Sequence, residues 1–204
     1  MTTTSETPTI RLAWPKTGAE IDLAAIQGLW TAEQYLALTE HTRYLVEFTD
    51  GVIEVLPMPT RTHQTILAYL YRIFFAALQP VGGIVLFSAF RMQIHPDKYR
   101  EPDLLLLLDA RDPRNQEAYW LGADLVVEIV SPDDPARDTV VKRSDYAEAG
   151  ISEYWIVNPL DETVTVLALA GSAYVEHGVF GRGERASSRL LAGLGVAVSE
   201  VFDA

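Results

Sequence analysis

Two apolar runs dominate the pattern of hydrophobic and polar positions, and each is associated with a carboxylate that the run does not explain. Leu104–Leu108 and Leu125–Val130 are almost continuously apolar, which is typical of strands covered on both faces. Asp103 lies where the first run begins, and on its own it is more often a turn residue at a strand entry. Glu128 interrupts the second run. Because glutamate is almost never fully buried unless it is paired or bound to a metal, Glu128 is a candidate functional residue, with a sheet-edge position as the alternative.

A helix is predicted after the second run, over Asp138–Ala149. Asp138, Lys142 and Tyr146 fall at positions i, i+4 and i+8 of this helix and form one polar stripe. Lys142 could make an exposed pair with Asp138, which would contribute little to stability. It could instead turn toward the two carboxylates, where it would orient or deprotonate a water molecule. Two carboxylates and a lysine brought together in this way would form a small metal-and-water site.

The N-terminal part predicts a short capped helix and a hairpin. Thr31 and the glutamine three residues later have the spacing of a capping box, which predicts a helix over Ala32–Leu38. Arg43–Phe48 and Val52–Leu56 flank an Asp-Gly pair, which two-residue hairpin loops favour. Glu47 lies within the first strand of this hairpin, between two apolar residues.

A longer helix is predicted over Arg61–Gln79, because its apolar residues recur at helical spacing. His63 and Gln64 lie in its first turn. The remaining apolar runs predict further strands and a C-terminal β-meander: Ile84–Phe87, Phe90–Ile94, Tyr154–Val157, Val164–Leu167 and Tyr174–Val179, with Val198–Phe202 closing the domain.

The length of 204 residues suits one domain over residues 1–204, and no linker, repeat or low-complexity tract divides it. Residues 1–13 are expected to be a flexible tail, although Ile10–Trp14 could add an edge strand. No apolar run approaches the ~18 residues that a membrane-spanning helix requires, and the start of the chain lacks the features of a signal peptide. We therefore expect a cytoplasmic protein with no membrane partner.

Composition restricts the chemistry. The chain has no cysteine, so any metal must be held by oxygen or imidazole ligands, which favours Mg²⁺, Mn²⁺ or Ca²⁺ over structural zinc. The net charge of −12 argues against broad, non-specific nucleic-acid binding. It leaves room for a local basic groove, because 8 of the 16 basic residues lie between positions 91 and 143, with both carboxylates. Surface solvation alone can produce such an enrichment.

Several motifs occur together and in a fixed order. They are TAEQYLAL, RYLVEFTDG, Thr62-His63-Gln64, Pro102-Asp103, LVVEIVSP, the stripe formed by Asp138, Lys142 and Tyr146, and AGISEYWIVNP. A Pro-Asp pair or a single glutamate in a strand would be weak evidence, whereas this ordered set is specific. The chain resembles the Uma-type (Uma-two) restriction-endonuclease family of the PD-(D/E)XK nuclease superfamily, over about residues 31–202.

The resemblance implies an α/β fold with a restriction-endonuclease-like core, in which a mixed central β-sheet is flanked by helices. It also implies phosphodiester hydrolysis with Mg²⁺ or Mn²⁺. Asp103 and Glu128 match the two acidic residues of the motif, so both would be metal ligands, and the backbone carbonyl of Ile129 matches a third. The sequence departs from the superfamily pattern at Val130, which stands where the motif has its lysine. Lys142 matches the position at which this family keeps a relocated lysine.

The resemblance also suggests roles for residues around this centre. Glu47 matches an acidic residue that the superfamily supplies from an earlier element and would assist catalysis. His63 and Gln64 match a His-Gln pair of the family, and His63 could either orient a phosphate or cap its helix. Asp138 and Tyr146 are candidates for contacts with the substrate or with the catalytic residues.

The leading hypothesis is a Mg²⁺- or Mn²⁺-dependent DNA endonuclease in which Asp103, Glu128, Lys142 and Glu47 carry the reaction. The alternative is a catalytically degenerate nuclease fold that acts as a dimeric binding module, which the acidic charge and the missing in-strand lysine favour. A glycosidase with a carboxylate pair receives little weight, because that mechanism needs no lysine. A homodimer is expected, since two sites related by a two-fold axis can cut both strands of a duplex.

Overall fold

The structure is a computed structural model that describes residues 11–13, 20–22 and 26–204. Most of the expected N-terminal tail, residues 1–10, therefore lies outside the described residues, as does Trp14. Strand β1 (Arg11–Ala13) pairs antiparallel with β2 (Glu20–Asp22) in a small separate sheet. Within the part of the chain that is described, no helix is long and apolar enough to cross a membrane.

The central element is a six-stranded sheet with the strand order β12-β11-β10-β9-β8-β5. Its strands are β5 (Ile84–Phe87), β8 (Leu104–Leu107), β9 (Leu125–Ile129), β10 (Glu153–Asn158), β11 (Thr163–Ala170) and β12 (Ala173–Phe180). The β9–β10 pair is parallel and the other pairs are antiparallel, so the sheet is mixed as expected. Every residue of β8 and β9 is buried, which confirms strands covered on both faces, except that Leu108, the last residue of the first apolar run, lies beyond β8 and is exposed.

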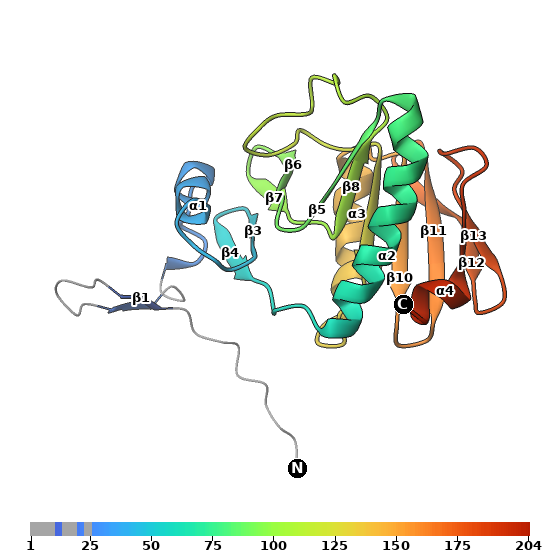
Figure 1. The fold of residues 1–204 in the computed structure, drawn as a ribbon. Helices are drawn as coiled ribbons and strands as arrows, with labels where there is room; N and C mark the ends of the chain where they lie inside the picture. The colour runs from blue at the N-terminus through green and yellow to red at the C-terminus, as the bar shows by residue number, and fades with distance from the viewer. Residues whose placement is uncertain (1–10, 14–19, 23–25) are drawn as a thin grey trace, which may run out of the picture.

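Helices cover both faces of this sheet (Figure 1). Helix α2 (Arg61–Leu78) buries a stripe of five residues against one face: Ile66, Leu67, Leu70, Phe74 and Leu78. In this layer the ring of Phe74 meets that of Trp155 on β10 edge to face at 5.5 Å. Helix α4 (Val198–Phe202) packs on the same side. Val198–Phe202 thus closes the domain as a helix that follows the hairpin β13 (Arg185–Ser187) and β14 (Gly195–Ala197).

The opposite face carries the helical segment that follows β9. A π-helical turn, η3 (Arg137–Val141), leads directly into α3 (Lys142–Glu148), so the helix expected over Asp138–Ala149 is wider in its first part. Tyr146 of α3 packs in a core cluster with Val126 and Tyr154, which point to this face. The segment ends at Gly150, whose φ of 71° is a left-handed value that favours glycine.

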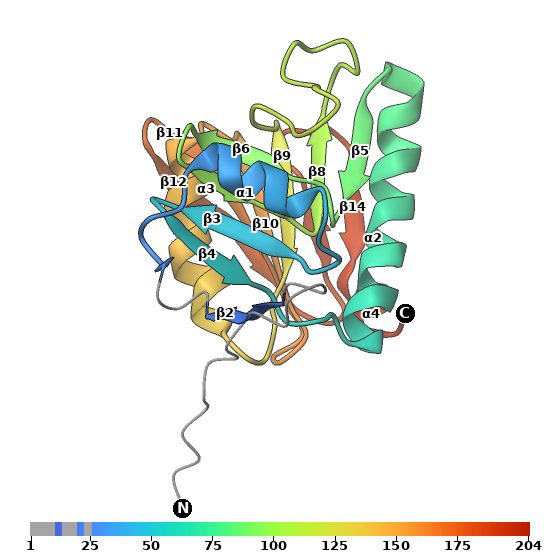
Figure 2. The ribbon, with the colours of Figure 1, turned by 90° about the vertical axis from the view of Figure 1, so that its left-hand side faces the viewer.

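A second sheet, with the order β4-β3-β7-β6, lies beside the first, and helix α1 (Ala32–Thr39) lies across it (Figure 2). Its strands are β3 (Val46–Thr49), β4 (Val52–Val55), β6 (Met92–His95) and β7 (Lys98–Arg100). The capping box at Thr31 is present. Asp50 and Gly51 form the predicted turn, with φ values of 47° and 83°. Gly51 is required for space as well, since a Cβ there would lie 2.6 Å from the carbonyl oxygen of Gly28.

Candidate functional site

Asp103 directly precedes β8, and Glu128 lies on β9, the antiparallel neighbour of β8. The register of the two strands begins with Leu104 paired with Val127, so Asp103 lies beside the end of β9 that carries Glu128. Asp103 Oδ2 accepts a hydrogen bond of 2.7 Å from the backbone N–H of Ile129. The carboxylate of Asp103 thus links the segment that precedes β8 to the end of β9.

Lys142 turns toward these carboxylates and is buried with them. Its Nζ lies 2.8 Å from Glu128 Oε1, 3.1 Å from Asp138 Oδ1 and 3.7 Å from Glu47 Oε1. The hydroxyl of Tyr146 donates to the same oxygen of Glu128. The stripe predicted on this helix therefore faces the sheet, and the alternative of an exposed pair with Asp138 is wrong.

The electrostatics of this centre separate the roles that Lys142 could have. Burial raises the pKa of Glu128 well above its ordinary range, and the nearby carboxylates of Asp138 and Asp103 add to the effect against the opposing charge of Lys142. Burial disfavours the charge on Lys142, but Glu128, Glu47 and Asp138 overcome this and raise its pKa. An ammonium with a raised pKa can donate hydrogen bonds to a water molecule but does not take a proton from it. Of the two expected actions, only orientation is compatible with this environment.

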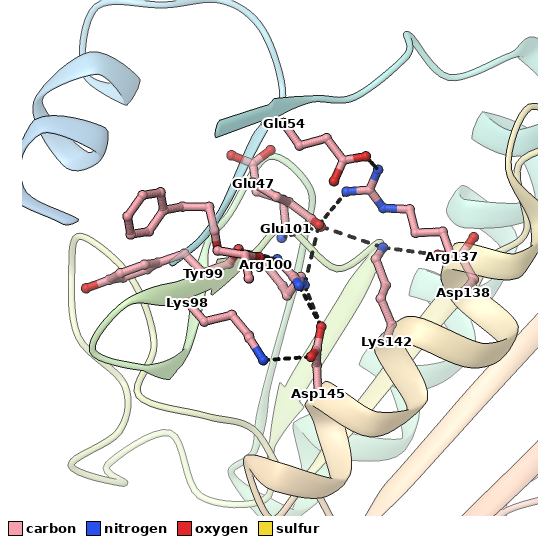
Figure 3. A network of polar contacts seen from close by, with 12 residues as sticks. Glu47, Glu54, Lys98, Tyr99, Arg100, Glu101, Arg137, Asp138, Lys142 and Asp145 are labelled. Atoms are coloured by element: carbon pink, nitrogen blue, oxygen red, sulfur yellow. Dashed lines mark hydrogen bonds and ion pairs between the residues drawn. The ribbon is translucent and has the colours of Figure 1, made fainter. Parts of the chain in front are cut away.

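Glu47 is adjacent to the centre, but both of its oxygens are occupied (Figure 3). Oε1 accepts from the backbone N–H of Glu101 at 3.1 Å, and Oε2 lies 2.5 Å from Arg137 and 3.6 Å from Arg100. Burial alone would raise its pKa, but the charges of Lys142, Arg137 and Arg100 lower the pKa to about 2. Glu47 is therefore an anchor for three cations and is ionised at neutral pH.

Sequence reasoning missed several members of this network, of which Arg137 and Glu54 are the most prominent. Arg137 bridges Glu47 and Glu54, with Nη1 at 2.5 Å from Glu54 Oε1. The enrichment of basic residues between positions 91 and 143 was the available signal for Arg137. The two-residue turn of the hairpin also fixes the register that pairs Glu47 with Glu54. Two glutamates directly opposite each other repel unless a cation lies between them. The predicted hairpin register therefore implies a cation beside Glu47 and Glu54, and this could have been inferred from the sequence.

A second missed carboxyl group is that of Glu101. It is buried, and its Oε2 has no hydrogen-bond partner among the described residues. Burial, together with the charge of Glu47, raises the pKa of Glu101 to about 7. Arg100, its neighbour, is paired with Asp145 of α3 at 2.7 Å, and Lys98 with the same carboxylate at 2.9 Å. These contacts tie β7 to the helix that carries Lys142.

His63 and Gln64 have different surroundings although they are adjacent in the sequence. The cap of α2 is the hydroxyl of Thr60, which accepts from the backbone N–H of His63 at 3.2 Å. The imidazole of His63 instead lies 3.1 Å from Asp103 Oδ2, so capping by that side chain is excluded. Gln64 is exposed and is not among the residues that line the cleft described next, so its expected contact with the substrate stays a prediction.

These groups line a cleft of about 230 Å³ between the start of α2, the end of β9 and the end of β4. Its walls carry seven carboxylates and two permanent cations: Glu54, Glu101, Asp103, Glu128, Asp133, Asp134 and Asp138 beside Arg137 and Lys142. The cleft is therefore strongly acidic. A phosphate can approach such a surface only where positive charge is available to receive it.

The donor set fits a hard divalent cation at Asp103 and Glu128. Within the described residues, Asp103 Oδ1 and Glu128 Oε2 accept no hydrogen bond, and both residues line the cleft. Oxygen donors of this kind suit Mg²⁺ and Mn²⁺, which keep several water ligands. No group of three or more His, Cys, Asp or Glu side chains in residues 26–204 could hold a metal ion. An ion at this pair would therefore need backbone and water oxygens as well.

One comparison with known proteins shows the fold of this chain and another shows its family. A solved structure described as "a putative nuclease belonging to DUF820 from Anabaena variabilis" superposes with a TM-score of 0.72 and 20% sequence identity, over 85% of this chain and 98% of that chain. No curated protein matches the chain. The sequence model of the Uma2 family, described as "Putative restriction endonuclease", matches residues 32–199. This chain therefore belongs to the Uma2 family.

Proposed function

We propose that this protein is a divalent-metal-dependent endonuclease that hydrolyses phosphodiester bonds of DNA. One observation carries the proposal: Asp103, directly before β8, accepts a hydrogen bond from the backbone N–H of Ile129 next to Glu128, and the ammonium of Lys142 lies 2.8 Å from Glu128 beside a cleft. Membership of a restriction-endonuclease family and a nuclease-like fold support it.

In this proposal Asp103, Glu128 and the carbonyl oxygen of Ile129 would hold Mg²⁺ or Mn²⁺. The chemistry that such an ion supplies when bound is a lowered pKa of a coordinated water and compensation of charge on the phosphate. Lys142 orients the attacking water through its N–H groups and offsets negative charge that develops on the phosphate oxygens. Tyr146 favours the ionised form of Glu128, because its hydroxyl donates to that carboxylate.

The imidazole of His63 and the backbone N–H of Ile129 hold Asp103 from two sides, at 3.1 and 2.7 Å. Both contacts are made to Oδ2, so we propose that Oδ1 is the oxygen that faces the ion. Glu47 keeps Lys142 and Arg137 in place and does not itself contact the substrate. In this proposal Glu128 acts in the reaction as a metal ligand, whereas Glu47 acts only through the cations that it positions.

The test is cleavage of supercoiled and linear duplex DNA with Mg²⁺ and with Mn²⁺. The wild-type protein is expected to cut, and Asp103→Asn and Lys142→Met are expected to lose activity by a factor of about 10³ or more. Asp109→Asn is the matched control, because Asp109 is an exposed aspartate that pairs only with Arg111 among the described residues. It should cut like the wild type. Equal cleavage by all four proteins would identify a contaminating nuclease.

A second candidate function is a nuclease-like binding module without catalysis. It is favoured by the engagement of Glu128 Oε1 by both Lys142 and Tyr146, because these two partners satisfy that oxygen without a metal. Calorimetric titration with Mn²⁺ separates the two. The endonuclease is expected to bind the ion at micromolar to millimolar concentrations, and this binding should disappear in Asp103→Asn. No heat of binding in the wild type would favour the module.

We also propose that the active form is a homodimer. Cleavage of both strands of a duplex is simplest when two identical sites are related by a two-fold axis. Light scattering at the concentration of the cleavage assay tests this directly. A protein that cuts both strands as a monomer would contradict the dimer and leave the proposed chemistry unchanged.

A further inference from the structure

Arg137 differs from the other cations of the network in how it is held. The side chains of Lys142 and Arg100 are 5% and 6% exposed, and buried carboxylates surround them. Releasing either would leave buried charges without partners, which costs several kcal/mol. The Arg137 side chain is 15% exposed and lines the cleft. Of the two permanent cations in the cleft wall, it is therefore the more accessible to an incoming anion.

The two carboxylates that Arg137 binds are unequal. Glu47 is 1% exposed and keeps the Glu101 N–H, Arg100 and Lys142 as further partners. Glu54 is 57% exposed, and Arg137 is its one ion-pair partner among the described residues. An ion pair exposed to this degree contributes little to stability. The Nη1 side of the guanidinium can therefore exchange its partner cheaply, while Nη2 stays anchored on Glu47 (Figure 3).

We propose that Arg137 is a phosphate-binding residue and that Glu54 occupies its outer N–H group until a nucleic-acid phosphate displaces it. The inference rests on the proposed function for the identity of the ligand. A guanidinium suits this exchange, because carboxylate and phosphate oxygens use the same planar array of N–H donors. The phosphate bound here is one that enters the cleft near Lys142, beside the scissile position.

The π-helical turn supports this assignment. Arg137 is the first residue of η3, the widened turn that precedes α3, and such turns occur frequently at functional sites. The same helical segment then presents Lys142 to Glu128. One continuous segment would thus supply both positive groups of the cleft wall, one for the attacking water and one for a neighbouring phosphate.

The test is binding of a fluorescently labelled duplex of about 20 base pairs to the full chain, measured by anisotropy with Ca²⁺ in place of Mg²⁺. Glu54→Gln is expected to bind about twofold to fivefold more tightly, because the competing carboxylate is lost. Arg137→Gln is expected to bind about tenfold more weakly. Its plot of log K against log [salt] should be shallower by about one, which corresponds to one lost phosphate contact.

Glu162→Gln is the matched control, since Glu162 is an exposed glutamate paired with Arg182 and it does not line the cleft. A gain in affinity equal to that of Glu54→Gln would mean that only net charge matters, and it would overturn the phosphate site. Arg137→Lys keeps a charge for Glu47 and replaces Arg137→Gln if that variant does not fold. Binding and salt slope of Arg137→Gln equal to those of the wild type would also overturn the site, and wild-type affinity in Arg137→Lys would overturn it if Arg137→Gln does not fold. If the wild-type protein binds DNA but does not cleave it with Mg²⁺ or Mn²⁺, the proposed hydrolysis is refuted and the phosphate site is not.

Discussion

Glu47→Gln tests the electrostatic core of the site without changing its shape. Glutamine is nearly isosteric with glutamate and can still accept the hydrogen bond from Glu101, so the substitution removes charge and creates no cavity. In the folded protein the pKa of Glu47 is about 2, compared with its ordinary value of 4.5. Burial opposes this lowering, and the cations Lys142, Arg137 and Arg100 cause it.

The size of the effect follows from this difference. Each pKa unit corresponds to about 1.4 kcal/mol, so ionised Glu47 contributes about 3 kcal/mol to the free energy of unfolding at neutral pH. Since the folded-state pKa is the lower one, this contribution is present above pH 4.5 and is lost as the pH falls toward 2. We expect Glu47→Gln to unfold about 3 kcal/mol more easily at pH 7 and about half of that difference to remain at pH 3.

The measurement is urea unfolding followed by circular dichroism between pH 7 and pH 3, because urea does not screen charges. At pH 7 the melting temperature should also fall by about 6–12 °C. Glu162→Gln is the control, since Glu162 binds an arginine in the same way but is exposed; its unfolding midpoint should hardly change. If Glu47→Gln destabilises no more than this control, or equally at pH 7 and pH 3, the electrostatic account of Glu47 is wrong.

Three further outcomes are expected. Tyr146→Phe removes a hydrogen-bond donor to Glu128 and thus raises the pKa of that carboxyl further. Mn²⁺ binding should therefore weaken about tenfold at pH 7 and recover toward pH 9. A loss of Mn²⁺ binding that is independent of pH would contradict this. Mn²⁺ at 100 times its dissociation constant should stabilise the wild type by about 2.7 kcal/mol but not Asp103→Asn, as measured by thermal unfolding. Glu153→Ala should destabilise the protein by about 3 kcal/mol or more, because four donors, including Ser188 at 2.7 Å, lose a buried acceptor; urea unfolding within 1 kcal/mol of the wild type would disagree.

The elements that the sequence predicts well are those whose signal is local. The capping box at Thr31, the Asp50-Gly51 turn and the apolar stripe of α2 each depend on residues a few positions apart, and all three are present. The adjacency of Asp103 and Glu128 was also predictable. Two buried strands that follow each other in the chain usually neighbour each other in the sheet.

The parts of the site that the sequence does not predict depend on contacts between residues that are distant in sequence. Arg137 and Glu47 are 90 positions apart, and no local sequence pattern predicts the ion pair between them. The buried carboxyl of Glu101 looks like an ordinary loop residue before Pro102. The secondary structure after β12 is the hardest part to predict from the sequence, because β13 and β14 have three residues each and their apolar pattern is too short to show a period.

The parallel pairing of β9 with β10 has a consequence for how the lysine of this site can move during evolution. A parallel pair needs a crossover connection over one face of the sheet, and residues 130–152 provide it with η3 and α3. In this chain the crossover therefore packs a helix over the side chain of Glu128. Lys142 is an inward-facing position of that segment and brings its ammonium to the carboxylate. The proposed relocation of the lysine, with Val130 at the end of the strand and Lys142 on the helix, would therefore need no rearrangement of the backbone.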